Sequence, residues 1–448
     1  MEMFCVQGGR ALRGVVRVEG SKNASLPILA ATLAVPGRVV LENIPQLQDV
    51  LTMRRLLLSM GAEIHESGPT SLAVDSSHVT VSIAPYELVR QMRAGVCVLG
   101  PLLARFGKAR VSLPGGCNIG HRPIDIHLRG LAQLGAEIRL ESGYIVAESS
   151  RLRGAEVDLR GVHGPTVTGT CNVLIAASLA RGRSVLRSAA REPEVADLGR
   201  FLNAAGARIT GLGTEVLEID GVDELQPVRH RVIPDRIEAA TLAIATAMTA
   251  GDVRIEDAPV EHLTAVIQVL QSIGVDVEVG ASSLRIHGTA RYRPVRLRAE
   301  PYPGLPTDVQ AQLTALLCLV PGESRIADHV FPDRFMHAAE LVRMGADIRV
   351  HGNAAYVCGV AQLSGAPVMA SDLRASAALV LAAISAQGFS EIRRVYHLDR
   401  GYHAFERKLN SLGACIERVH EEVPTQLVPA PHLDLSGHRA RNRAVRRD

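Results

Sequence analysis

The apolar and polar positions of this chain repeat in one arrangement six times. An alanine-rich apolar stretch ends at a glycine and is followed by a short strand, such as 38–41 or 184–187. An amphipathic helix comes later and ends at Gly-Ala or Gly-Val, where a left-handed glycine commonly closes a helix. The first glycines are Gly37, Gly107, Gly182, Gly251, Gly322 and Gly388, and the second are Gly61, Gly135, Gly206, Gly274, Gly345 and Gly413.

Each unit predicts a buried helix, a strand, a loop, an amphipathic helix and further strands. The second set of glycines recurs, by subtraction of their numbers, every 68 to 74 residues, which is too long for a solenoid repeat. We therefore predict an α/β fold of two inside-out domains. Each domain has three units, with the apolar helices buried inside and the sheets around them.

The boundary between the two domains is predicted at a polar, proline-marked connection, 223–234. The strand-like stretch 4–17 has no helix before it, so we expect it to complete the second domain. The first domain then spans 22–232, and the second spans 1–21 together with 233–430. Residues 431–448 are basic and are expected to form a disordered tail, with a docking tag as the alternative.

The composition mainly excludes classes of protein. The 448 residues carry a net charge of +3, and the five arginines and two aspartates of 431–448 supply 5 − 2 = +3 of it. The rest is near neutral and poor in aromatic residues, which does not indicate a nucleic-acid surface. Seven cysteines without CxxC spacing indicate free thiols in a reducing cytoplasm. No signal pattern opens the chain, and apolar runs such as 375–386 are too short to cross a bilayer, so no membrane insertion is expected.

The most distinctive loop reads LPGGCNIGHRPID from Leu113. Gly115 and Gly116 favour a mobile backbone, and Arg122 is a fork-shaped donor suited to a carboxylate or phosphate. A nearby cation makes a cysteine thiol more reactive, so Cys117 is a candidate to act on an anionic substrate. The alternative is a glycine-rich turn whose cysteine only packs.

Single charged residues recur at equivalent places of the units. One such residue alone is usually a solvated charge, but equivalent ends of repeated units should converge. Convergence predicts a cleft with five or more cations and few carboxylates, which suits a multiply charged phosphate substrate. The starts of the predicted inner helices carry Lys22, Arg93, Arg236, Asp308 and Arg374, and strand-end loops add Cys117, Arg122, Arg334 and Arg400.

Other chemistries are not indicated. The sequence has no P-loop, no dinucleotide fingerprint after a strand and no HExxH helix. His121 and His127 lie near each other without further metal-ligand spacing, so we expect them to be supporting or surface residues. No metal and no cofactor are expected.

Eight motifs in order resemble the UDP-N-acetylglucosamine 1-carboxyvinyltransferase family of enolpyruvyl transferases, from about residue 4 to 419. The resemblance implies the inside-out fold predicted above. It also implies transfer of the enolpyruvyl group of phosphoenolpyruvate to the 3′-hydroxyl of UDP-N-acetylglucosamine, with release of phosphate. That reaction opens peptidoglycan synthesis in the cytoplasm and so serves cell-wall biogenesis, cell shape and division. The motifs are GSKNASLPILAATLA from Gly20, LPGGCNIGHRPIDIH from Leu113, AAREPEVADL from Ala189, PDRIEA from Pro234, PTDVQAQ from Pro306, DRFMH from Asp333, DLRASAALVLA from Asp372 and HLDRGY from His397.

The resemblance also implies residue roles. Asp308 matches the general base for the sugar hydroxyl, a role that requires raised basicity or tight positioning. Cys117 matches a loop cysteine that acts as proton donor, covalent adduct partner or aid to product release. The donor's phosphate and carboxylate fall to Lys22, Arg122 and Arg400, with Asn23 beside them. The remaining implied substrate contacts are Arg93, Arg334 and Arg374 for charge and closure, Pro123, Ile124, Asp125 and Leu128 for uridine, Thr166, Val167 and Gly169 near the diphosphate, and Val330 for the sugar.

Three alternatives stay open, and the sequence does not indicate an oligomeric state. The first is 5-enolpyruvylshikimate-3-phosphate synthase, against which the PGGC loop and the AAREPE segment argue. The second is a non-catalytic paralogue that binds UDP-sugars, against which the joint presence of Lys22, Cys117, Asp308 and Arg400 argues. The third is a transferase for a modified UDP-sugar, which departures from the family pattern such as Cys171 and Ser188 leave possible.

Overall fold

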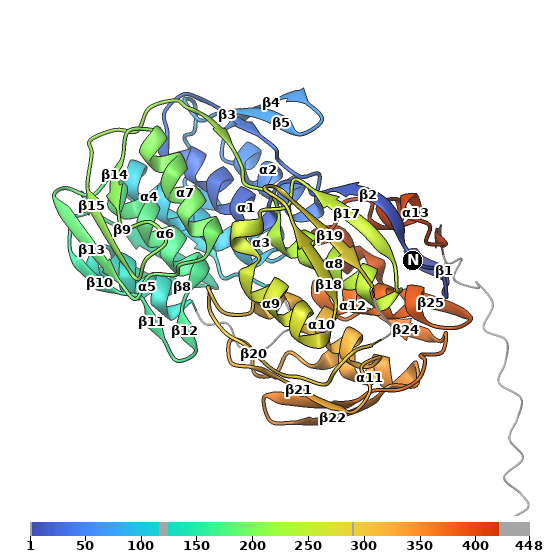
Figure 1. Cartoon of the computed structure of the whole chain (residues 1–448). Coiled ribbons are helices and arrows are strands. Elements are labelled where there is room, and N and C mark those ends of the chain that lie inside the picture. The colour runs from blue at the N-terminus through green and yellow to red at the C-terminus, as the bar shows by residue number, and fades with distance from the viewer. Residues whose placement is uncertain (1, 116–123, 289–290, 421–448) are drawn as a thin grey trace, which may run out of the picture.

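The computed structural model describes residues 2–115, 124–288 and 291–420, and it divides into two lobes (Figure 1). Buried hydrophobic residues form one cluster from 24–232 and another from 4–18 together with 237–416. Apolar helices lie inside and sheets outside, which confirms the predicted α/β fold class. The domain limits 22–232 and 1–21 with 233–430 stay a prediction with which this division is consistent. The predicted tail lies outside the described residues.

Within the described residues, six four-stranded sheets share one topology. An edge strand pairs parallel with its neighbour, and the next two pairings are antiparallel. A two-stranded hairpin, β11 (Arg160–Gly161) and β12 (Gly164–Pro165), lies beside them. The sheets of the first lobe, in order of neighbouring strands, are β16 (Arg229–Arg231), β3 (Arg38–Glu42), β5 (Ser71–Asp75) and β4 (Glu63–Gly68); β6 (Ile83–Ala84), β7 (Lys108–Ser112), β9 (Tyr144–Glu148) and β8 (Glu137–Glu141); and β10 (Glu156–Asp158), β13 (Arg183–Arg187), β15 (Val216–Asp220) and β14 (Arg208–Thr210).

The N-terminal strands belong to sheets of the second lobe. β1 lies between two strands from the C-terminal part of the chain, and β2 pairs parallel with β17. The chain therefore passes between the lobes twice, near residues 20 and 234, where Gly20 and Pro234 form an antiparallel bridge. The second-lobe sheets are β18 (Asp276–Val279), β19 (Ser283–His287), β17 (Asp252–Glu256) and β2 (Arg13–Arg17); β20 (Arg296–Ala299), β21 (Glu323–Asp328), β23 (Ala354–Cys358) and β22 (Asp347–His351); and β24 (Pro367–Met369), β25 (Phe389–Arg393), β1 (Glu2–Gln7) and β26 (Ile416–His420).

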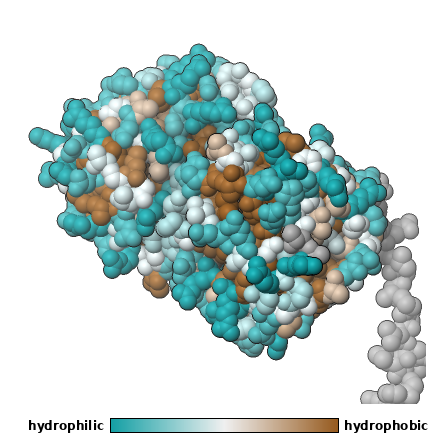
Figure 2. Space-filling model, viewed as in Figure 1, coloured by the Kyte–Doolittle hydropathy of each residue, from teal (hydrophilic) through white to brown (hydrophobic). Residues whose placement is uncertain are grey.

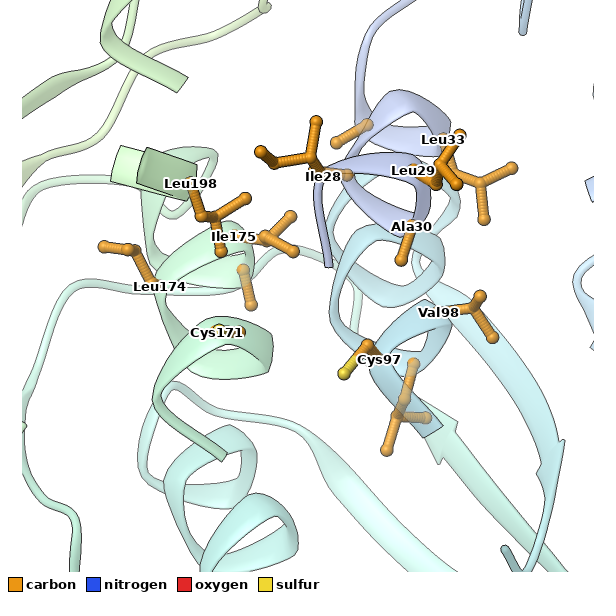
Figure 3. Packing of buried hydrophobic residues seen from close by; sticks show 14 of the residues in the cluster. Ile28, Leu29, Ala30, Leu33, Cys97, Val98, Cys171, Leu174, Ile175 and Leu198 are labelled. Carbon is orange, nitrogen blue, oxygen red and sulfur yellow. The ribbon is translucent and has the colours of Figure 1, made fainter. Parts of the chain in front are cut away.

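Each unit has one inner helix, and the inner helices are buried on nearly every side because their residues are apolar all round. In the first lobe, side chains of four helices meet, and Ile28 points toward Ile175 and Leu198 (Figure 3). The four are α1 (Lys22–Ala31), η2 (Arg93–Val98), α6 (Val167–Ser178) and α7 (Pro193–Ala204). This close packing makes the lobe a rigid support for residues at the helix starts. The inner helices are α1 (Lys22–Ala31), α4 (Leu99–Phe106), α6 (Val167–Ser178), α8 (Arg236–Met248), α10 (Gln310–Leu317) and α12 (Leu373–Ser385).

The outer helices each bury one face, and each ends next to a glycine of the second set. These glycines all have positive φ, between 91° and 105°, which confirms the predicted left-handed helix ends. Shorter elements are α3 (Tyr86–Val89), η1 (Thr32–Ala34), η3 (Val260–His262), η4 (Thr307–Val309) and η5 (Val395–Arg400). The outer helices are α2 (Gln48–Ser59), α5 (Asp125–Gln133), α7 (Pro193–Ala204), α9 (Thr264–Ile273), α11 (Met336–Arg343) and α13 (Phe405–Ser411).

Two local features go beyond the predicted units. The second and fifth inner helices open with 3₁₀ turns, η2 from Arg93 and η4 from Thr307, before they continue as α4 and α10. After the fourth inner helix the left-handed residue is Ala250, with φ of 48°, whereas the other five units have a glycine of the first set with positive φ. Gly251 lets the backbone of Leu12 pack closely against it, since a Cβ there would lie 2.2 Å from the carbonyl oxygen of Leu12.

The surface fits a protein whose apolar residues are mostly interior. On the face shown in Figure 2, hydrophilic residues predominate over the outer sheets, and hydrophobic residues gather near the middle. Among the residues that the structure describes, no helix is long and apolar enough to cross a membrane.

Candidate active site

One charged cluster joins the two lobes around Asp49. Lys22 begins α1, where the Ser21 side chain caps the helix, and its Nζ lies 2.9 Å from Asp49 Oδ2. Arg400, at the end of η5 in the second lobe, donates from Nε to Asp49 Oδ1 at 2.9 Å. Asp49 lies in the first turn of α2 and is only 4% exposed. The predicted Lys22 and Arg400 therefore meet from opposite lobes with a carboxylate between them.

A second cluster surrounds Asp308 in η4. Arg334 Nη1 donates to Asp308 Oδ1 at 2.9 Å, and Arg374 Nη2 donates to Oδ2 at 3.2 Å. Asn23 reaches across from the first lobe, and its Nδ2 donates to Asp308 Oδ2 at 3.3 Å. Since Asn23 follows Lys22 in the chain, the two clusters are neighbours.

Electrostatics keep both carboxylates ionised. Burial alone would raise the pKa of Asp308, but the charges of Arg374 and Arg334 hold that pKa well below its usual value. Burial opposes Lys22 and Arg400 in the same way at Asp49, and the pKa of Asp49 is lowered as well. Asp308 could act as a base through raised basicity or through tight positioning, and its lowered pKa rules out raised basicity. Tight positioning by three donors is what this arrangement provides.

Buried hydrogen bonds lie behind Asp308 and steady it. Gln312 Nε2 donates to the carbonyl oxygen of Asp308 at 3.0 Å and to Thr241 Oγ1 at 3.1 Å. The hydroxyls of Tyr402 and Thr241 are 2.8 Å apart. The Arg374 guanidinium lies 5.3 Å from the centre of the Tyr402 ring. Because these groups are buried and mutually bonded, they restrict the positions open to Asp308 and Arg374.

Arg236 also reaches a carboxylate of the other lobe. Its Nε and Nη2 donate to Glu194 at 2.9 and 3.2 Å, and both side chains are buried. The guanidinium lies 5.4 Å from the ring centre of Tyr302. The predicted inner-helix cation thus forms a bidentate bridge between α8 and the start of α7.

The prediction of a mainly cationic cleft did not name two of the carboxylates that lie among its cations. Five of the predicted cations pair with three carboxylates, because a charge taken out of water requires a partner. Asp49 and Glu194, which sequence reasoning missed, both lie in the first turns of outer helices. Their place in a first turn is the one signal that the sequence carries for them, and it does not identify their partners. The pairs are Lys22 and Arg400 with Asp49, Arg334 and Arg374 with Asp308, and Arg236 with Glu194.

The segments predicted for the nucleotide come together at the starts of α5 and α6. His127 joins them, since its Nε2 lies 3.2 Å from Thr168 Oγ1 and its Nδ1 lies 3.2 Å from Asn172 Nδ2. His127 is buried, so it is not a surface residue, and the supporting role stays a prediction. Ile124, Asp125 and Leu128 lie at the start of α5, and Thr166, Val167 and Gly169 at the start of α6, where Thr166 Oγ1 accepts from the Gly169 N–H at 3.2 Å.

The loop of Val330 is tied to the Asp308 cluster. Asp328 accepts from the Val330 N–H at 2.9 Å and from the Thr307 hydroxyl at 2.5 Å, and Arg334 Nη1 also donates to Thr307 Oγ1 at 3.2 Å. Arg93 is half-buried at the start of η2. Cys117, Arg122 and Pro123, also predicted for the site, lie outside the described residues.

Six cysteines are described, and all are free thiols. Burial raises the pKa of Cys97 and of Cys318 to about 12, so both stay protonated and unreactive at neutral pH. Burial likewise raises the pKa of Cys171 well above its usual value. Within the described ranges, no group of three or more His, Cys, Asp and Glu side chains could hold a metal ion.

Comparisons with known proteins agree with this geometry. Residues 6–409 match the family model described as EPSP synthase (3-phosphoshikimate 1-carboxyvinyltransferase). The solved enolpyruvyl transferase NikO from Streptomyces tendae superimposes with a TM-score of 0.86 at 28% identity, covering 93% of this chain and 98% of that one. An EPSP synthase from Acinetobacter baumannii, 17% identical, shares the fold with a TM-score of 0.72, covering 94% of this chain and 100% of that one. Fold and site thus define an enzyme of the carboxyvinyl (enolpyruvyl) transferase class.

Curated relatives indicate a particular family within this class. Proteins named UDP-N-acetylglucosamine 1-carboxyvinyltransferase are 54% identical in Sorangium cellulosum and 50% identical in Geobacter metallireducens. Each alignment covers 94% of this chain, and 99% and 100% of the respective relatives. The chain belongs to the UDP-N-acetylglucosamine 1-carboxyvinyltransferase family.

Proposed function

We propose that the chain transfers the enolpyruvyl group of phosphoenolpyruvate to the 3′-hydroxyl of UDP-N-acetylglucosamine and releases phosphate. The observation that supports this most is the meeting of two residue pairs across the lobes. Lys22 and Asn23 come from the first lobe, and Asp308 and Arg400 come from the second. A buried site with cations for the donor beside a positioned carboxylate for the acceptor has the groups that this addition requires.

The reaction is an addition followed by an elimination. Asp308 accepts the proton of the sugar 3′-hydroxyl while the oxygen of that hydroxyl forms a bond to C2 of the donor and a proton adds to C3. This gives a tetrahedral ketal. Loss of a C3 proton and cleavage of the C2–O bond to phosphate then give the enolpyruvyl ether. Because Arg334 and Arg374 weaken Asp308 as a base, its proton transfer accompanies C–O bond formation, when the hydroxyl becomes acidic.

The donor's charges fall to Lys22 and Arg400, with Arg122 as a third cation. Their charges stabilise the phosphate as it leaves and offset the negative charge of the two substrates. Uridine and the diphosphate are assigned to the starts of α5 and α6, and the sugar to the loop of Val330. Arg93 completes the substrate contacts, with Pro123 beside the uridine segment.

Cys117 is the proposed reactive thiol, as proton donor to C3, covalent partner or aid to product release. We expect a small phosphonate epoxide to alkylate it and to inhibit turnover. Cys97 and Cys318 are not competitors because burial keeps these thiols protonated. The variant Cys117→Asp should lose this sensitivity, and persistent alkylation with inhibition would identify another thiol.

The deciding assay is phosphate release from phosphoenolpyruvate, with UDP-N-acetylglucosamine and shikimate 3-phosphate supplied separately. Release with the nucleotide sugar alone is expected. Release with the shikimate ester alone would assign the chain to the related synthase. No release with either, despite measurable binding of the nucleotide sugar, would favour a modified acceptor or a binding protein.

The proposed reaction is the first committed step of peptidoglycan synthesis, and we place it in the cytoplasm, the reducing compartment that free cysteines indicate. It contributes to cell-wall biogenesis, cell shape and division through that product. No cofactor takes part in the proposed steps.

A further inference from the structure

Asp49 is a carboxylate of the charged site to which the proposed transfer steps assign no part. Its Oδ2 lies 2.9 Å from Lys22 Nζ and 3.4 Å from Arg400 Nη2, and its Oδ1 lies 2.9 Å from Arg400 Nε. The side chains of Lys22, Asp49 and Arg400 are 10%, 5% and 18% exposed. Asp49 is thus a buried carboxylate bonded to two of the three cations that we assign to the donor.

The neighbouring carboxylates are occupied in other ways. Asp372 and Asp235 cap helices α12 and α8 by accepting backbone N–H groups. Asp308 bonds to Arg334 and Arg374. Of the carboxylates in the described site, Asp49 is the one with bonds to Lys22 and Arg400 from both of its oxygens.

We propose that Asp49 is the internal counter-ion of the donor site, where it positions Lys22 and Arg400 across the two lobes and limits how tightly an anion binds. The proposal rests on the proposed function, since it takes these two cations as part of the donor's site. Asp49 touches no reacting atom in it and is a positioning residue.

The charges of these three residues do not cancel completely. Lys22 and Arg400 bring two positive charges, and Asp49 cancels one of them. An incoming phosphate must share both cations with a buried carboxylate that repels it. A doubly charged phosphate group gains enough from the two cations to bind, whereas a weakly charged group gains less. The same repulsion favours departure of the phosphate once its bond to C2 is broken. Asp49 would thereby select for a strong anion and prevent its retention.

Inorganic phosphate is the probe, and the variant is Asp49→Asn, which keeps the shape of the side chain and removes its charge. Phosphate affinity is measured from the rise of the unfolding temperature with phosphate concentration, at constant ionic strength. We expect Asp49→Asn to bind phosphate about tenfold more tightly or better than the native chain, as loss of one nearby like charge implies. In turnover we expect a lower KM for phosphoenolpyruvate together with a lower kcat, because the two cations are less well placed and phosphate leaves more slowly.

If Asp49 has only a structural role, Asp49→Asn changes the phosphate affinity in the opposite direction. If the carboxylate only holds Lys22 and Arg400 in place, Asp49→Asn binds phosphate more weakly and raises KM. That result overturns the proposal, as does unchanged affinity or an absence of phosphate binding in both proteins. Asp49→Ser, which also removes the charge, repeats the test if the asparagine variant does not fold, and Asp49→Glu should restore weak binding.

The matched control is Asp252→Asn. It makes the same change in net charge on the exposed sheet of β17, where Asp252 pairs with Arg285. We expect no change in its phosphate affinity, and a rise equal to that of Asp49→Asn would show a general charge effect and overturn the proposal. Phosphate release by the native chain is measured separately. Native turnover with unchanged affinity in Asp49→Asn refutes this role alone, whereas absent turnover refutes the proposed function.

Discussion

His337 should make the second lobe sensitive to mild acid. It lies in α11 beside the site residue Arg334, is 2% exposed, and its Nε2 has no hydrogen-bond partner among the described residues. Burial lowers the pKa of His337 to about 4, and Arg334 acts in the same direction while Asp372 opposes them. The ring is therefore neutral in the folded chain throughout the neutral range.

The pKa of His337 in the folded and in the unfolded chain determines how the free energy of unfolding changes with pH. An unfolded histidine has a pKa of about 6.5, so between that value and about 4 the unfolded chain binds the additional proton. The contribution of neutral His337 to the free energy of unfolding is complete above pH 6.5 and is lost as the pH falls toward the folded value. The loss amounts to about 2 kcal/mol between pH 7 and pH 5, and to about 3 kcal/mol at lower pH.

The measurement compares urea unfolding of the native chain and of His337→Gln, which is polar, similar in size and does not titrate. Two lobes give more than one transition, and the transition that the substitution shifts at pH 7 identifies the second lobe. The native transition should lose about 2 kcal/mol more than the variant between pH 7 and pH 5. Equal losses in both proteins would refute the inference that burial holds His337 neutral.

Three further changes test the site and the core. Glu194→Gln leaves Arg236, which is 6% exposed, without its carboxylate, and should lower the free energy of unfolding by about 3–5 kcal/mol; urea unfolding measures it, and addition of Arg236→Met should recover most of the loss. Asp308→Asn should reduce phosphate release by about 10²–10⁴-fold, the usual contribution of a general base, while calorimetry still detects the nucleotide sugar; a near-native rate would exclude Asp308 as the base. Phe201→Ala removes a fully buried ring of α7 and should cost about 3–5 kcal/mol in the first-lobe unfolding transition; a loss below about 1 kcal/mol would contradict the packing described.

Much of the fold could be predicted from local pattern because its signals are local. Apolar residues all round a helix require burial, and a glycine after an amphipathic helix accepts positive φ without strain. These two signals, repeated six times, predicted the inner helices, the helix ends and the α/β class. The charged residues at the inner helix starts, such as Lys22 and Asp308, were predicted to converge by the same reasoning, and the structure brings them together.

Partners in the site were beyond local pattern because they are distant in sequence. Arg400 and Asp49 are 351 positions apart, and Arg236 and Glu194 are 42 apart and in different lobes. No spacing rule identifies such pairs, and an acidic residue in the first turn of an outer helix is ordinarily solvated. Only packing removes the water and makes each charge depend on one partner.

The sequence by itself determined which segments are buried, where helices end and which charges lie at equivalent ends. Tertiary structure alone decided that Asp49 stands between Lys22 and Arg400 and that two arginines lower the pKa of Asp308. It also decided that the N-terminal strands β1 and β2 complete sheets of the second lobe. The physical reason is the same in each case. Burial and helix ends are set by neighbours within a few residues, whereas charge pairing and strand pairing depend on which distant surfaces exclude water together.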